Sequence, residues 1–90
     1  MKYFAVFLTM KDEEKNKQFR ADHLQFLDEQ MKQGTVFAKG PFMDGSGGLV
    51  VYQVDNISTA EKLVKLDPYV INGAREYEIR EWKMEVGKGE

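Results

Sequence analysis

The sequence contains no cysteine and only one histidine, His23. The lack of cysteine excludes disulfide bonds and thiolate metal sites within the chain. A single histidine, with no second imidazole one helical turn away and no cluster of carboxylates, also disfavours a metal site of histidine and acidic ligands. We therefore expect a protein that binds no metal and needs no organic cofactor.

The chain has no excess of positive charge, because 13 lysines and arginines stand against 15 aspartates and glutamates, for a net charge of −2. A nucleic-acid-binding domain needs a basic face, and the apolar segment 48–54 lacks the aromatic spacing of an RNA-stacking strand. No segment approaches the roughly 20 apolar residues of a membrane span. The N-terminal apolar run meets Lys11, Asp12, Glu13 and Glu14 without a signal-peptide cleavage site. We expect a cytoplasmic protein with neither a nucleic-acid nor a membrane partner.

The chain is also short. Ninety residues predict a single domain, residues 1–90, that buries only about 60–65% of its unfolded surface. Small domains without disulfides or metals often gain stability by association. The thin core therefore already favours an oligomer.

Four apolar segments have the length and composition of strands. They are residues 3–10, 35–39, 49–54 and 77–86. The first and third are apolar on both faces, which requires a covering layer on each side of their sheet. Proline cannot extend a central ladder, so Gly40 and Pro41 are expected to end the second strand. The last strand changes its apolar phase midway, which predicts a bulge near Arg80 and Glu81.

Two segments have helical periodicity. The first is residues 12–33, with Asp12 as N-cap and Gly34 as the C′ glycine. The second begins at Ser58, which with Glu61 fits a capping box, and ends before Asp67-Pro68, because the residue before proline avoids the helical region. We expect this helix to bury Ala60, Leu63, Val64 and Leu66. Residues 69–73 form a tight connection with room for one more helical turn.

The resulting order is β-α-β-β-α-β, the ferredoxin-like arrangement of the α+β class. It predicts a four-stranded antiparallel sheet with two helices on one face. The other face would then leave apolar side chains in water, and an exposed patch of that size usually marks an interface. We therefore expect a homodimer that packs sheet against sheet.

The first helix places its only histidine in the stripe that should face the core. That stripe contains Phe19, Arg20, His23, Phe26, Leu27 and Met31. A buried polar side chain without a partner costs about 1–3 kcal/mol, so His23 needs one. It is either a structural histidine satisfied by the backbone or part of a site. Since Arg20 shares its face, the second alternative implies an anionic partner, either a carboxylate of this chain or that of a small ligand.

Asp67 is the candidate internal partner, because two antiparallel helices on one face can bring the end of the second beside the first half of the first. Asp44 remains an alternative. Asp44 and Ser46 lie in the glycine-rich loop 41–48, which is either a flexible hairpin connection or a lid whose polar side chains reach the mouth of a cavity.

These motifs, in this order, resemble the YciI-like family over nearly the whole chain. They are Arg20-x-x-His23-Leu24, then Gly40-Pro41, the glycine-rich loop and Asp67-Pro68-Tyr69. The resemblance implies a dimeric α+β barrel with a pocket that holds a histidine–aspartate pair. Carried over to this sequence, the pair is His23 and Asp67, with Arg20, Gly40, Pro41 and Tyr69 around it. The family mostly lacks an assigned reaction, and a related member is a dehydrochlorinase of a chlorinated hydroxymuconate, a small diacid.

Three functions follow from these observations. The first is a cofactor-independent lyase or isomerase, similar to a dehydrochlorinase, acting on a small anionic substrate. In this function His23 is the general acid/base and Asp67 orients the imidazole. Arg20 binds a carboxylate, and the backbone around Gly40 stabilises a developing oxyanion. The second is a protein that binds a small ligand in the same pocket without chemistry. The third is a structural assembly unit in which His23 is satisfied by the backbone.

Overall fold

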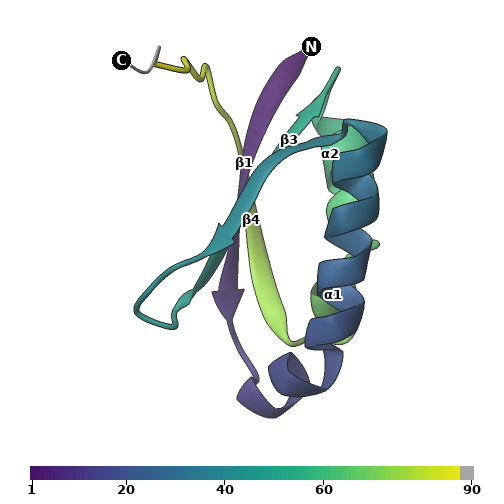
Figure 1. Ribbon diagram of the computed structural model, residues 1–90, viewed down its shortest axis with the longest axis vertical. Helices are drawn as coiled ribbons and strands as arrows, with labels where there is room; N and C mark the ends of the chain where they lie inside the picture. Colours follow the sequence, from purple (N-terminus) through teal and green to yellow (C-terminus); the bar gives the residue numbers. More distant parts are fainter. Residues whose placement is uncertain (88–90) are drawn as a thin grey trace.

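The computed structural model describes residues 1–87 and consists of one sheet with helices packed on one of its faces (Figure 1). Along the chain the elements are β1 (Lys2–Met10), α1 (Glu13–Gln33), β2 (Val36–Pro41), β3 (Gly47–Val54), α2 (Ile57–Val64), α3 (Pro68–Ile71) and β4 (Arg75–Glu81). The segment that follows β4 runs toward the end of the molecule where the N-terminus lies (Figure 1).

The four strands form an antiparallel sheet in the order β2-β3-β1-β4. This is the ferredoxin-like fold, and the predicted α+β architecture is confirmed. The order places β1 and β3 in the centre and leaves β2 and β4 as edges. The two central strands are those that the sequence marks as apolar on both faces.

The core lies between the sheet and α1 and α2. Side chains that alternate along the strands point toward the helices, and they pack with Leu27 of α1 and with Ala60 and Val64 of α2. The strand residues of this core are Phe4, Val6, Leu8, Val36, Val50, Tyr52 and Val54. One wall of the core is thus built from every second residue of β1 and β3, as a period of two requires.

The second and third strands are longer than predicted. Gly40 and Pro41, expected to close β2 from outside, belong to the strand; Pro41 is its last residue and pairs with Gly48, and β3 begins at Gly47. Proline is tolerated there because β2 is an edge strand, where one side of the backbone needs no ladder partner. The loop between them shrinks accordingly to residues 42–46.

The prediction for the last strand was wrong at both ends. β4 begins at Arg75, pairs with β1 in a continuous register from Met10 to Phe4 and ends at Glu81. Its expected bulge is absent from this pairing, and Trp82 and Met84 follow the strand. The phase change in the sequence therefore marks the end of the strand. The sheet has its irregularity in β2 instead, between Val36 and Ala38.

Helix ends follow capping chemistry. Asp12 caps α1 by accepting a hydrogen bond from the Lys15 amide at 3.1 Å, and Gly34 ends α1 in the left-handed region at φ 84°; both ends were predicted. The predicted capping box at Ser58 was wrong, because Asn56 caps α2 through the Thr59 amide at 2.9 Å. Either residue type is a good N-cap. The earlier one is used, and Leu66, expected in the core, lies beyond α2 and is 57% exposed.

The buried stripe of α1 differs in part from the prediction. His23 and Leu27 are buried as expected, and Phe19 and Phe26 are half-buried, but Met31 is 42% exposed. Gln30 is buried instead and is the neighbour of Thr35 in the turn that leads into β2. Arg20 is exposed. Among residues 1–87 no helix has the length and apolar character needed to cross a membrane.

Candidate functional site

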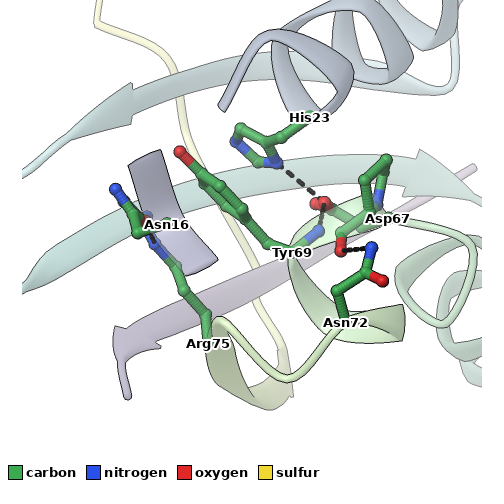
Figure 2. Close-up of polar contacts among 7 residues, drawn as sticks. Asn16, His23, Asp67, Tyr69, Asn72 and Arg75 are labelled. Carbon is green, nitrogen blue, oxygen red and sulfur yellow. Dashed lines mark hydrogen bonds and ion pairs between the residues drawn. The ribbon is translucent and has the colours of Figure 1, made fainter. Parts of the chain in front are cut away.

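His23 and Asp67 meet, although 44 positions separate them in the sequence. Nδ1 of His23 lies 2.7 Å from Oδ1 of Asp67, and both side chains are almost fully buried, with 6% and 1% of each residue exposed (Figure 2). An ionised carboxylate can only accept a hydrogen bond, so Nδ1 of His23 donates. The other ring nitrogen points away from Asp67 and remains available to take or give a proton (Figure 2).

Asp67 is placed by the start of α3. Its Oδ1 also accepts from the Tyr69 amide at 2.9 Å, so one oxygen caps α3 and orients the imidazole. Pro68 follows at the first helical position, where its fixed φ and missing N–H are favourable. The Asp-Pro dipeptide, expected to end the second helix, therefore opens α3 instead, three residues beyond the end of α2, and its aspartate holds His23. Asp44, the alternative partner, lies in the loop 42–46 and accepts from the Ser46 amide at 2.9 Å.

Tyr69 stacks on the imidazole. The ring centroids of His23 and Tyr69 are 3.9 Å apart with an interplanar angle of 16°. On the Tyr69 ring rests the guanidinium of Arg75, 4.4 Å from the ring centroid, and Arg75 Nε donates to Asn16 Oδ1 at 2.9 Å (Figure 2). Three elements therefore fix the site: Asn16 and His23 come from α1, Asp67 and Tyr69 come from the N-cap and first turn of α3, and Arg75 opens β4.

His23 lies at the wall of a cavity of about 100 Å³. Of the residues predicted around the site, the cavity is lined by Arg20, Gly40, Pro41 and Tyr69, whereas Asp44 and Ser46 lie in the exposed loop and are outside its lining. Asp67 sits behind His23 and is also outside the lining. The remaining lining residues are Leu8, Leu24, Leu27, Lys39, Gly48, Leu49, Val50 and Arg75. The cavity thus combines three cationic side chains with an aliphatic wall.

Sequence reasoning missed Lys39 and Arg75. Arg75 could have been found, because it lies two residues before Tyr77 and four before Ile79, on the strand face that points toward the helices. Lys39 could not, since the irregularity between Val36 and Ala38 reverses the alternation of β2 and turns Lys39 to the cavity side. Lys39 Nζ lies 3.7 Å from Asp28 Oδ1 of α1.

Burial sets the electrostatics of this region. It lowers the pKa of Arg75, with the nearby Tyr69 and Asp67 acting in the opposite direction. Burial raises the pKa of the Tyr69 phenol, while the Arg75 and Arg20 cations oppose that rise. Burial and then the Asp67 charge raise the pKa of Tyr52, which lies in the core. Both tyrosines therefore stay neutral at physiological pH.

No group of three or more histidine, cysteine, aspartate or glutamate side chains within residues 1–87 is arranged to hold a metal ion. The arrangement that is present is a buried imidazole with a carboxylate behind it and cations beside it. Such a pair can accept a proton from a bound anionic molecule and return it. The carboxylate fixes the tautomer and orientation of the imidazole and stabilises the imidazolium form, as in other histidine–aspartate pairs.

Comparisons with known proteins agree with this picture. The model of the YCII-related domain family matches residues 1–83. The uncharacterized protein YjpA of Bacillus subtilis (strain 168) is 35% identical over 82 residues, which are 91% of this chain and 96% of that protein. A solved structure, 5-chloro-2-hydroxyhydroquinone dehydrochlorinase (TftG) from Burkholderia phenoliruptrix AC1100 in complex with 2,5-dihydroxybenzoquinone, has a TM-score of 0.77. That match covers 90% of this chain and 93% of the other at 16% identity, which establishes the likeness of fold alone.

Proposed function

Because this chain belongs to the family of YCII-related domains and carries a buried histidine–aspartate pair at the wall of a cationic cavity, we propose that it is a cofactor-independent lyase or isomerase. Its substrate is a small, enolisable anion. The observation that carries the proposal is the hydrogen bond of 2.7 Å between His23 and Asp67 in a place where periodicity calls for an apolar side chain. The dehydrochlorinase of similar fold supports the lyase class by analogy.

In this proposal His23 removes a proton from a carbon next to an electron-withdrawing group. The electron pair of that C–H bond forms a new π bond, and the leaving group departs with its own electron pair. In a dehydrochlorination the leaving group is chloride, and the proton held by His23 then returns to solvent. Arg20 binds the substrate's negative charge, and Asp67 stabilises the imidazolium that forms. Proton transfer by a positioned side chain contributes typically about 10²–10⁴-fold.

The test is turnover by the purified protein of small carboxylic acids and of chlorinated dihydroxy aromatics, including 5-chloro-2-hydroxyhydroquinone. Products are followed by mass spectrometry and chloride release by an ion-selective electrode. The His23→Asn variant carries a polar amide in place of the basic imidazole. Because the amide cannot take up a proton, we expect kcat to fall by about 10²–10⁴-fold. Asp67→Asn keeps an acceptor for His23 and removes the charge, and it should lower kcat as well.

Saturable binding of an acid with no product from any substrate would instead assign the cavity to ligand binding. Full turnover by His23→Asn would exclude the catalytic role of this residue. A matched control is Glu29→Gln, because Glu29 is an exposed carboxylate on the same helix that does not line the cavity.

The face of the sheet opposite the helices supports a second part of the proposal, a homodimer formed sheet against sheet. This face carries Tyr3, Phe7, Phe37, Leu49 and Val51, and Phe37 packs edge-on against Tyr3 with 5.6 Å between ring centroids. A hollow of about 250 Å³ lies on it. The hollow shares Lys39, Gly40, Pro41 and Leu49 with the His23 cavity. A second copy on this face would therefore contact β2, whose residues Lys39, Gly40 and Pro41 also line the His23 cavity.

A further inference from the structure

We propose that Arg75 fixes the negatively charged group of the ligand, and that the ligand is therefore a small carboxylic acid that reaches both Arg75 and His23 in the one cavity. The proposal rests on the function proposed above and deepens it. It assigns a role to a residue that the catalytic scheme does not use.

The guanidinium of Arg75 is held in place by neutral partners. Its Nε donates to Asn16 Oδ1, and its planar face rests on Tyr69 (Figure 2). Arg75 is half-buried, and burial lowers its pKa. Among residues 1–87 it forms no ion pair with a carboxylate. A partly buried cation that contacts no carboxylate directly is costly, and a bound anion relieves that cost.

The free edge of this guanidinium suits a carboxylate. Because Nε is engaged by Asn16, the two terminal nitrogens remain, and Arg75 lines the same cavity as His23. Two parallel N–H groups match the two oxygens of a carboxylate. Gly48 leaves the space for this edge, since a Cβ on Gly48 would lie 3.3 Å from Arg75 Nη1 and 2.8 Å from Gly40 O.

The stacking of His23, Tyr69 and Arg75 limits the distance between the imidazole and the guanidinium. The imidazole centroid lies 3.9 Å from that of Tyr69, and the guanidinium carbon lies 4.4 Å from the latter, so imidazole and guanidinium are no more than about 8 Å apart. On α1, Asn16, Arg20 and His23 follow one another at helical spacing on a single stripe. Arg20 therefore lies between the residue that holds Arg75 and the proposed base. Arg20, which is exposed, supplies charge, and Arg75, which is held on two sides, sets the position.

The experiment compares butanoate with butanamide, which differ in the carboxylate and hardly in shape. Dissociation constants are measured by NMR titration of the full chain, following the side-chain signals of Tyr69 and the Nε–H of Arg75. Butanoate should bind saturably and shift the Arg75 Nε–H signal, and butanamide should not. Arg75→Gln should weaken butanoate binding about 10-fold to 100-fold, as expected for the loss of charge-assisted hydrogen bonds.

Two further variants separate charge from position. Arg75→Lys keeps the positive charge but removes the two parallel N–H groups of the guanidinium. Asn16→Ala keeps Arg75 but removes the acceptor of its Nε. Both variants should therefore weaken butanoate binding less than Arg75→Gln does. The matched control is Arg80→Gln, because Arg80 lies on the same strand, is exposed and pairs with Glu78 at 2.8 Å. It should leave butanoate binding unchanged.

The outcomes distinguish this proposal from the catalytic one. Butanoate binding in His23→Asn that still depends on Arg75 supports the carboxylate site whether or not a reaction is found. Folded Arg75→Gln that binds butanoate as the unmodified chain does would overturn the site and leave the role of His23 intact. Lack of saturable butanoate binding at tenths of molar concentration, or equal binding of butanamide, would also overturn it.

Discussion

Asp67 is the residue on which the site depends most. One oxygen caps α3 and accepts from His23, and the other, Oδ2, is buried without a hydrogen-bond partner among residues 1–87. Burying a carboxylate costs free energy, and the hydrogen bonds that Oδ1 accepts from His23 and from the Tyr69 amide offset part of that cost. A fold that needed only a helix cap would have no reason to bury this charge, which favours a functional origin for the pair.

Stability measurements can quantify the pair. We expect His23→Ala and Asp67→Ala each to lower the free energy of unfolding by about 1–3 kcal/mol, because each leaves a buried polar partner unpaired. The double variant should lose about 1–3 kcal/mol less than the two single losses combined, because the partners are in direct contact. Urea denaturation of the four proteins gives this coupling energy, and strict additivity would contradict the contact.

Tyr52 allows a prediction of pH dependence. Its pKa is raised in the folded chain by burial and by the Asp67 charge. The stability that comes from a neutral Tyr52 is therefore fully present below the ordinary tyrosine pKa of about 10 and falls as the pH rises above it. The stability difference between the unmodified chain and Tyr52→Phe should shift in favour of the variant between about pH 8 and about pH 11. A difference that is constant over this range, measured by urea denaturation, would refute the shift.

The sequence predicts single residues well where one periodicity decides their place. His23 and Arg20 follow from the 3.6-residue repeat of α1, and Asp67 follows from the arrangement of two antiparallel helices on one face of the sheet. Arg75 and Lys39 depend on where a strand begins and on a bulge. Those features are set by pairing between segments that are distant in the chain, which local patterns do not encode.

At the scale of elements, the existence and type of each strand and long helix were predictable, whereas the ends were less so. Pro41 extends β2 because the strand lies at an edge, and β4 ends at Glu81, opposite Phe4, with one further hydrogen bond from the Trp82 amide to the Tyr3 carbonyl at 2.8 Å. Both ends depend on the strand order β2-β3-β1-β4. The α1 ends, by contrast, depend on local capping by Asp12 and Gly34 and were found from the sequence.

Two glycines at element ends should differ sharply when replaced by alanine. Gly34 has a φ of 84°, but the space around it is open, since nothing lies within 4 Å of its Cβ position. Gly47 has a φ of 146°, and a Cβ there would lie 2.0 Å from the Leu8 carbonyl oxygen. We expect Gly34→Ala to cost about 1–2 kcal/mol for backbone conformation alone. Gly47→Ala should cost more, because the β1–β3 ladder must also shift.

The measurement is urea denaturation with Gly40→Ala as the control. Gly40 has neither a positive φ nor an atom within 4 Å of its Cβ position, so its replacement should be within about 0.5 kcal/mol of neutral. A Gly47→Ala variant that is as stable as Gly34→Ala would show that the start of β3 is not tightly packed against β1.

At the scale of the whole molecule, the two faces of the sheet are unequal. The helix side is closed by α1 and α2 (Figure 1). On the other side aromatic and aliphatic residues of β1, β2 and β3 lie next to a charged row on β4, which contains Glu76, Glu78 and Arg80. An apolar patch rimmed by charge is the usual anatomy of an interface.

The proposed dimer therefore predicts a doubling of mass. Sedimentation equilibrium should give about twice the 10.4 kDa of one chain, and Phe37→Glu should shift the protein to monomer, because Phe37 is 40% exposed on the apolar face, where it packs against Tyr3. A specific interface needs roughly 1,200 Å² of buried surface, and a buried, unpaired carboxylate within it is costly. Ile71→Glu is the matched control, because Ile71 is 62% exposed but lies on α3, on the helix side. A monomeric unmodified chain, or equal dissociation by both variants, would exclude the sheet face as the interface.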